Sequence, residues 1–167
     1  MFDPPTKAHL DLLLTAKRVF PVIDVLVANN AAKKPWFTLA ERVEMFQDIF
    51  KIMPDQEESI RIVPVDNEYV PMKIKYASFV IRGLRNGIDF GYETELMRLY
   101  RMMNYRLEPI YFPSLPENNM DLISSSMVKS LVGPPGWEEM VANFLPVSVV
   151  PKFIARAKTV VLGQPKT

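Results

Sequence analysis

The chain has 167 residues, 49% of them hydrophobic, which suits one domain with one sizeable core. Its formal net charge of +1 gives no overall attraction to nucleic acid or to a membrane surface, so any anion site must be local. The lack of cysteine excludes a disulfide framework, a cysteine metal site and a cysteine nucleophile, and no apolar run reaches the roughly 18 residues that span a bilayer. We expect a single soluble domain over residues 1–167, in the cytoplasm or an organelle matrix.

The one histidine of the chain comes at the start of the first predicted helix. His9 directly precedes a leucine-rich run, and Leu10, Leu13, Leu14 and Lys17 keep helical spacing. The unpaired amides of a helix start attract anions, and an imidazole N–H there can add a hydrogen bond to a phosphate. A single histidine near a terminus is more often a surface residue, so this interpretation depends on the rest of the chain.

Strand-like and helix-like stretches alternate through the first half. The β-branched run at residues 22–28 is typical of a buried parallel strand. Thr38 and Glu41 have the spacing of a capping box, which predicts a helix start. That helix places its apolar residues on one face and stops before Pro54, and residues 59–65 alternate like a second strand.

The second half continues the alternation, which indicates an α/β protein with a parallel sheet. Residues 78–81 predict a strand that ends at Arg82-Gly83-Leu84-Arg85, residues 89–106 a long helix, and residues 108–112 the last strand. The hydroxyls of Ser124, Ser125 and Ser126 crowd a further helix start. Residues 133–167 are expected to be helical in two pieces, separated by Phe144-Leu145-Pro146.

Four polar groups fall at predicted strand ends or helix starts, so all four are expected at one edge of the sheet, where ligands of parallel sheets bind. They are His9 with Thr6, Lys33 with Lys34, Arg82 with Arg85, and the three serines. Together they could surround a polyphosphate. Phosphoryl and nucleotidyl transfer depends mainly on positive charge and oriented N–H groups, so such an enzyme needs no protein nucleophile.

Several short blocks of the chain occur in the order and approximate spacing of a known family. The blocks are Phe2-Asp3-Pro4, Thr6 with His9, the run from Lys33 to Val43, Ile81-Arg82-Gly83-Leu84-Arg85, Asp89-Phe90 with Tyr92-Glu93, Ile123-Ser124-Ser125-Ser126-Met127-Val128-Lys129, and Phe144-Leu145-Pro146. From Phe2 to about Lys158 the chain resembles the phosphopantetheine adenylyltransferases. The resemblance implies a Rossmann-like nucleotidyltransferase fold, with a doubly wound parallel sheet, and transfer of AMP from ATP onto 4'-phosphopantetheine with Mg²⁺. It also implies coenzyme A or dephospho-coenzyme A as ligands and a homohexamer.

The resemblance assigns a role to each matched residue. His9 and Thr6 match the (T/H)xGH motif, in which the histidine contacts the ATP phosphates and stabilises the transition state. Lys33 matches the lysine that steadies the attacking phosphate, and Arg82 the arginine on the phosphopantetheine side. The remaining ATP-site positions are Phe2, Arg85, Glu93, Ser124, Ser125 and Ser126, with Arg85 also counted as catalytic. No protein residue is expected to bind the metal directly, because Mg²⁺ arrives on the ATP phosphates.

The chain departs from the family pattern in several places. Met1 stands where the family has Ser or Thr after its first strand, so that central strand is expected to be missing, and Ala8 replaces the motif glycine. Pro71 and the lack of helical spacing at residues 67–72 argue against the family's helix before residue 75. An insertion at residues 133–139 and the tail at residues 160–167 have no match.

Two hypotheses follow. In the first, the chain is an active adenylyltransferase, because the matched polar residues all persist. In the second, it is a catalytically weakened relative that serves as a structural subunit of a larger assembly, because the first strand and the motif glycine are absent. A nucleotidyltransferase with another phosphorylated acceptor is the alternative within the enzyme class.

Overall fold

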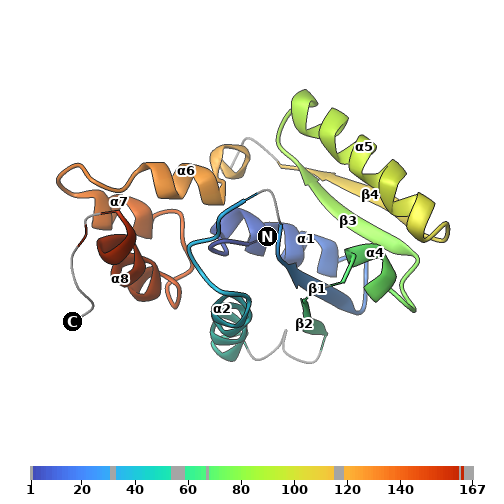
Figure 1. Ribbon diagram of the computed structural model, residues 1–167, viewed down its shortest axis with the longest axis horizontal. Coiled ribbons are helices and arrows are strands. Elements are labelled where there is room, and N and C mark those ends of the chain that lie inside the picture. The colour runs from blue at the N-terminus through green and yellow to red at the C-terminus, as the bar shows by residue number, and fades with distance from the viewer. Residues whose placement is uncertain are drawn as a thin grey trace.

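The computed structural model describes residues 2–30, 33–53, 59–66, 68–114, 119–161 and 163, and its strands alternate with helices (Figure 1). The strands are β1 (Ile23–Ala28), β2 (Ile60–Val65), β3 (Phe79–Leu84) and β4 (Glu108–Pro113). The helices are α1 (Lys7–Lys17), α2 (Leu39–Lys51), α4 (Val70–Lys73), α5 (Gly87–Met103), α6 (Ser125–Ser130), α7 (Trp137–Ala142) and α8 (Val150–Val160), with a 3₁₀ turn η2 (Met120–Leu122) before α6. The alternation confirms the predicted α/β class, and none of the described helices could cross a membrane.

The strands pair in parallel, as predicted, but in two small sheets. β1 pairs with β2, which sets Val25 opposite Ile62, and β3 pairs with β4, which sets Ile81 opposite Ile110. The order is β1-β2 in one sheet and β3-β4 in the other. Each pair is separate from the other in Figure 1.

One edge of β1 faces away from β2. Because the N–H of Ile23 donates to the carbonyl of Ser59 (2.9 Å), the backbone groups of the alternate residues Asp24 and Leu26 point to the opposite edge. Within the described ranges no strand pairs with that edge, or with the corresponding edge of β3. The prediction of a missing central strand rests on Met1, which lies outside the described residues.

Helix α2 forms as its sequence predicts. Thr38 donates its N–H to Glu41 Oε2 (2.8 Å), and Glu41 donates its N–H to Thr38 Oγ1 (3.2 Å), which completes the capping box. The apolar face is buried through Met45, Phe46, Ile49 and Phe50. The helix ends at Lys51, and Pro54, predicted to follow its end, lies outside the described residues.

The main core lies among α1, β1, the start of β2, α2 and the helices α6 to α8. The largest fully buried apolar side chains in this core are Phe46 of α2 and Phe153 of α8. The ring of Phe153 stacks on Trp36 with centroids 5.7 Å apart and lies 6.5 Å from Phe37. Trp137, from the insertion, is also buried, so this insertion packs into the core rather than exposing its indole.

Segments near β3 correct two predictions. Residues 70–73 form the single-turn helix α4 where no helix was expected, because Pro71 occupies the first turn, in which its missing N–H costs nothing. The side-chain amide of Asn104 holds this turn through the carbonyls of Pro71 (3.2 Å) and Ile74 (3.0 Å). Strand β3 runs through Arg82 to Leu84, so Arg82 lies inside the strand rather than after it.

Candidate functional site

The N-terminal loop and α1 hold His9 in one defined tautomer. The backbone N–H of Thr6 donates to His9 Nδ1 (3.0 Å), and the Thr6 hydroxyl lies 2.9 Å from the same atom. Because a backbone N–H can only donate, Nδ1 must be the unprotonated nitrogen, and the neutral ring carries its proton on Nε2. That Nε2–H is the donor open to a ligand. Thr6 itself is fully buried and acts on the site through His9.

Burial also keeps the imidazole of His9 neutral. It lowers the pKa of His9 to about 3, and nearby positive charge, including that of Arg85, lowers the pKa in the same direction. The edge of the Phe2 ring packs against the imidazole with centroids 4.9 Å apart. At neutral pH, His9 is therefore a neutral hydrogen-bond donor rather than a cation.

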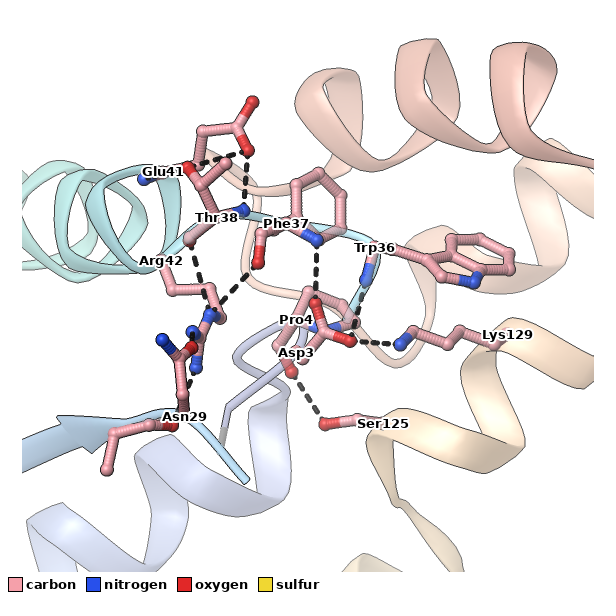
Figure 2. A network of polar contacts seen from close by, with 11 residues as sticks. Asp3, Pro4, Asn29, Trp36, Phe37, Thr38, Glu41, Arg42, Ser125 and Lys129 are labelled. Atoms are coloured by element: carbon pink, nitrogen blue, oxygen red, sulfur yellow. Dashed lines mark hydrogen bonds and ion pairs between the residues drawn. The ribbon is translucent and has the colours of Figure 1, made fainter. Parts of the chain in front are cut away.

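Asp3 connects the N-terminal loop to two other segments (Figure 2). Its carboxylate is almost fully buried and accepts the backbone N–H groups of Trp36 (3.0 Å) and Phe37 (2.9 Å). The ammonium of Lys129, on α6, forms an ion pair with the same carboxylate and lies 5.1 Å from the centre of the Trp36 ring. One carboxylate thus joins the start of the chain, the segment after Lys33 and helix α6.

Arg42 supports the other side of this segment. Its buried guanidinium donates to the carbonyls of Phe37 (3.2 Å), Thr38 (3.2 Å) and Ala28 (2.9 Å), and to the side-chain oxygen of Asn29 (Figure 2). Burial lowers the pKa of Arg42, while the negative charge of Asp3 opposes that shift. The end of β1 and the start of α2 are held together by one side chain.

Lys33 lies in the connection between these two anchored points. Its backbone N–H donates to the carbonyl of Asn30 (3.0 Å). Lys33 and Lys34 are exposed, and no described residue forms an ion pair with either ammonium group. The structure thus presents the predicted lysine as an exposed side chain whose backbone is hydrogen-bonded to the end of the preceding segment.

Arg82 and Arg85 are both held by carboxylates of α5. Arg82 forms an ion pair with Glu93 in which both side chains are mostly buried. Arg85 binds Asp89 through Nε (2.7 Å) and a terminal nitrogen (3.0 Å), and its backbone N–H adds a third bond at 3.2 Å. This pairing raises the pKa of Arg85 and lowers the pKa of Asp89. Because Asp89 binds Nε and one terminal nitrogen, the other terminal nitrogen of Arg85 has no partner among the described residues and can donate to a further acceptor.

The three predicted serines occupy different positions. Ser124 caps α6 by accepting the N–H of Met127 (3.0 Å), and the Ser125 hydroxyl donates to the carbonyl of Pro4 (2.7 Å). Ser126 is exposed, and no hydrogen bond of its hydroxyl occurs within the described part of the chain. Two of the serines therefore position α6 against the N-terminal loop, and the third presents its hydroxyl to solvent.

Several predicted groups are brought together and others are not. Gly83 of β3 lies against Leu12 of α1, the charge of Arg85 lowers the pKa of His9, and Ser125 ties α6 to the N-terminal loop. Among the described residues, no hydrogen bond or ion pair joins Lys33 to His9. The described residues contain no cluster of three acidic or histidine side chains that could hold a metal ion.

Sequence reasoning overlooked the residues that position the site. Asp3 and Lys129 occur in the blocks that carry the family resemblance, but nothing in their spacing pairs residues 126 positions apart. Arg42 also falls in such a block, yet a charged residue at the start of an amphipathic helix is usually exposed. The signal that could have found it is its position one turn after the N-cap, facing the apolar side.

Comparisons with known proteins identify chains that are similar to this one. The cytidylyltransferase-like family matches residues 1–131. A phosphopantetheine adenylyltransferase of Neisseria meningitidis is 31% identical over 156 residues, covering 92% of this chain and 88% of the relative. Proteins of the same name from Pasteurella multocida and Campylobacter hominis are 34% and 39% identical over 131 residues, covering 78% of this chain and 79% of each relative.

Proposed function

Because the chain belongs to the cytidylyltransferase-like family and, with these relatives, to the phosphopantetheine adenylyltransferases, we propose that it is an enzyme that transfers AMP from ATP to 4'-phosphopantetheine. An oxygen of the acceptor's phosphate bonds to the α-phosphorus of ATP, and the bond from that phosphorus to pyrophosphate breaks. The products are dephospho-coenzyme A and pyrophosphate. No protein nucleophile takes part, so the protein acts by positioning and by stabilising charge.

The observation that carries the proposal is the tautomer of His9. Its Nε2–H is a neutral donor fixed by two contacts with Thr6, and such a donor can follow the negative charge that grows on the phosphates in the transition state. A neutral imidazole that only donates a hydrogen bond keeps its proton during transfer. His9 therefore needs no reprotonation between turnovers. We assign His9 to the ATP phosphates, with Phe2 and Thr6 shaping its surroundings.

The cationic residues divide between donor and acceptor. Lys33 is assigned to the attacking phosphate of phosphopantetheine, since its side chain is exposed while its backbone N–H is bonded to the carbonyl of Asn30. Arg82 is assigned to the acceptor side, and Arg85 with Glu93 to ATP. Ser126 offers a free hydroxyl to the outer phosphates, while Ser124 and Ser125 hold α6 in place.

We propose Mg²⁺ as the metal of the reaction, bound to ATP rather than to a protein cage. The carboxylates nearest the site are already engaged, Asp3 by Lys129, Asp89 by Arg85 and Glu93 by Arg82. Mg²⁺ usually keeps several waters and binds nucleotide phosphates, whose charge it neutralises. This fits a site that supplies cations and N–H donors.

The direct test is pyrophosphate release by the purified chain. We expect release to require ATP, 4'-phosphopantetheine and Mg²⁺ together, and mass spectrometry to identify dephospho-coenzyme A. Release with a different phosphorylated acceptor, and none with phosphopantetheine, would support the alternative substrate. No acceptor-dependent release at all would support the structural-subunit hypothesis, which the similarity to named enzymes does not favour.

We also propose that copies of the chain associate through α5. Ile88, Tyr92, Leu99 and Met102 lie on one face of this helix, and Ile88 and Met102 are 85% and 83% exposed. An apolar stripe of this kind marks an interaction surface more often than a solvated face. Light scattering should show an oligomer, such as the hexamer expected for the family, and Leu99→Glu with Met102→Glu should shift it to smaller species.

A cytoplasmic or organelle-matrix location remains our proposal.

A further inference from the structure

We propose that Asp3 is a positioning residue of the adenylyl-transfer site, which fixes the Lys33 segment and helix α6 relative to the loop that carries His9. This inference rests on the proposed function. Asp3 is six residues from His9 in the chain, and its carboxylate binds both of the other segments directly.

The surroundings of Asp3 require a charged carboxylate. Among the described residues, its carboxylate accepts hydrogen bonds from the N–H groups of Trp36 and Phe37 and from the ammonium of Lys129, and all of these groups are donors. An ionised carboxylate is the one side-chain group of this size that only accepts. An asparagine at this position would turn an NH₂ group toward at least one donor and leave a buried hydrogen bond unmade.

The bonds of Asp3 also set the position of aromatic packing. One of the two backbone amides that donate to Asp3 belongs to Trp36, whose ring stacks on Phe153 of α8 and lies 5.1 Å from the Lys129 ammonium. Movement of Trp36 would therefore disturb α6 and α8 at once. Lys33 lies three residues before Trp36 on the same segment, so a shift of Trp36 would also shift Lys33.

Arg42 does not make Asp3 redundant. Arg42 fixes the carbonyls of Phe37 and Thr38 and the end of β1. The carboxylate of Asp3 instead joins the backbone of Trp36 and Phe37 to Lys129 of α6, which also lies against the Trp36 ring. The second link of α6 to the N-terminal loop is the single bond from Ser125 to Pro4.

The test compares Asp3→Asn with Asp24→Asn. Asp24 also forms an ion pair, accepting Arg61 Nε (2.6 Å) and a terminal nitrogen of Arg61 (3.0 Å), but this pair is exposed on β1 and β2 away from the Asp3 network. We expect Asp3→Asn to lower kcat about 10- to 100-fold at a temperature where both variants are fully folded. Asp24→Asn should keep the wild-type rate.

Two further measurements separate positioning from stability alone. Lys129→Arg keeps a charged donor and should retain most of the activity, whereas Lys129→Met should not, and Asp3→Asn with Lys129→Met should lose less than the product of the two single losses. Hydrogen exchange of the Trp36 and Phe37 amides should be faster in Asp3→Asn than in Asp24→Asn. A loss of thermal stability with unchanged kcat would overturn the proposal.

Failure of the inference is distinguishable from failure of the proposed function. If the wild type makes dephospho-coenzyme A and Asp3→Asn does so at the same rate, only the inference fails. If the wild type makes none, the proposed function fails, and the amide exchange together with Mg-ATP binding to both variants decides the role of Asp3. Equal exchange and equal binding in Asp3→Asn and Asp24→Asn would then reject it.

Discussion

The half of the molecule that contains α1, β1, α2 and α6 to α8 differs sharply in packing from the half that contains α4, β3, α5 and β4. The first half holds most of the buried apolar side chains, including Phe46, Leu145 and Phe153. In the second half, the buried apolar residues among those described are Pro71 of α4, Met97 of α5 and Leu107 before β4, while most of the exposed large apolar side chains lie between residues 69 and 105. Burial of apolar side chains therefore stabilises the first half much more than the second.

The residues of the candidate site come from both halves of the molecule, and they are held in different ways. His9, Lys33 and Ser126 are carried by the packed half, where buried bonds from Thr6, Asp3 and Arg42 fix the backbone. Arg82 and Arg85 belong to the open half, where carboxylates of α5 hold them. A phosphate can compete with a carboxylate for a guanidinium, but it cannot displace a buried backbone bond. The packed half thus provides rigid donors and the open half exchangeable ones.

The largest expected effect tests the packing contrast itself. Phe153→Ala removes a fully buried ring and should lower the free energy of unfolding by about 3–5 kcal/mol. Tyr76→Ala, at a side chain that is 97% exposed between α4 and β3, should change it by less than about 0.5 kcal/mol. Urea denaturation of both variants at one protein concentration checks this. Equal losses in the two variants would mean that the halves do not differ as the structure shows.

The next effect tests the rigid donor of the packed half. His9→Ala removes the Nε2–H and should lower kcat by about 10² to 10³, as loss of one transition-state donor does. Arg18→Ala, at the exposed end of the same helix, should leave kcat unchanged. Steady-state pyrophosphate release by the folded variants is the measurement. A His9→Ala variant with wild-type kcat would remove His9 from the chemistry.

A third effect follows from the low pKa of His9. Since its folded pKa is about 3 and its unfolded pKa 6.5, the unfolded chain takes up a proton first as pH falls. The contribution of His9 to the free energy of unfolding is complete above about pH 6.5. It declines at lower pH and is about 2 kcal/mol smaller at pH 5. His9→Ala should lack this part of the pH dependence. Because the chain has one histidine, imidazole NMR should report the neutral Nε2–H tautomer from pH 5 to 8, without ambiguity of assignment.

The smallest effect tests the exchangeable cations. Asp89→Asn removes the charge that holds Arg85 and should raise KM for ATP about 3- to 10-fold, with less than about 1 kcal/mol of stability lost because the pair is partly exposed. Glu95→Gln, which removes a carboxylate of the exposed pair with Arg98 on the same helix, is the matched control. A change in kcat rather than in KM for Asp89→Asn would place Arg85 among the rigid groups.

Local patterns predicted much of the fold. The β-branched runs, the Thr38 capping box and the two-piece helical tail all correspond to elements of the structure, because each depends on neighbours in the chain. The single turn at α4 was missed, because a proline that breaks a helix interior is acceptable in its first turn. The ends of β3 and α5 also differ from the prediction by a few residues, since pairing and capping contacts decide them.

By itself the sequence determined the α/β class, the family and the set of polar residues from which the site is drawn, since residue order and type suffice for these. Only the tertiary structure decided how those residues act. It assigned Thr6 to orient His9, Ser124 and Ser125 to hold α6, and Asp3 and Arg42 to anchor the segment of Lys33. The reason is physical: the tautomer of an imidazole and the partners of a buried charge depend on groups up to 126 residues away, and only folding brings them within hydrogen-bond distance.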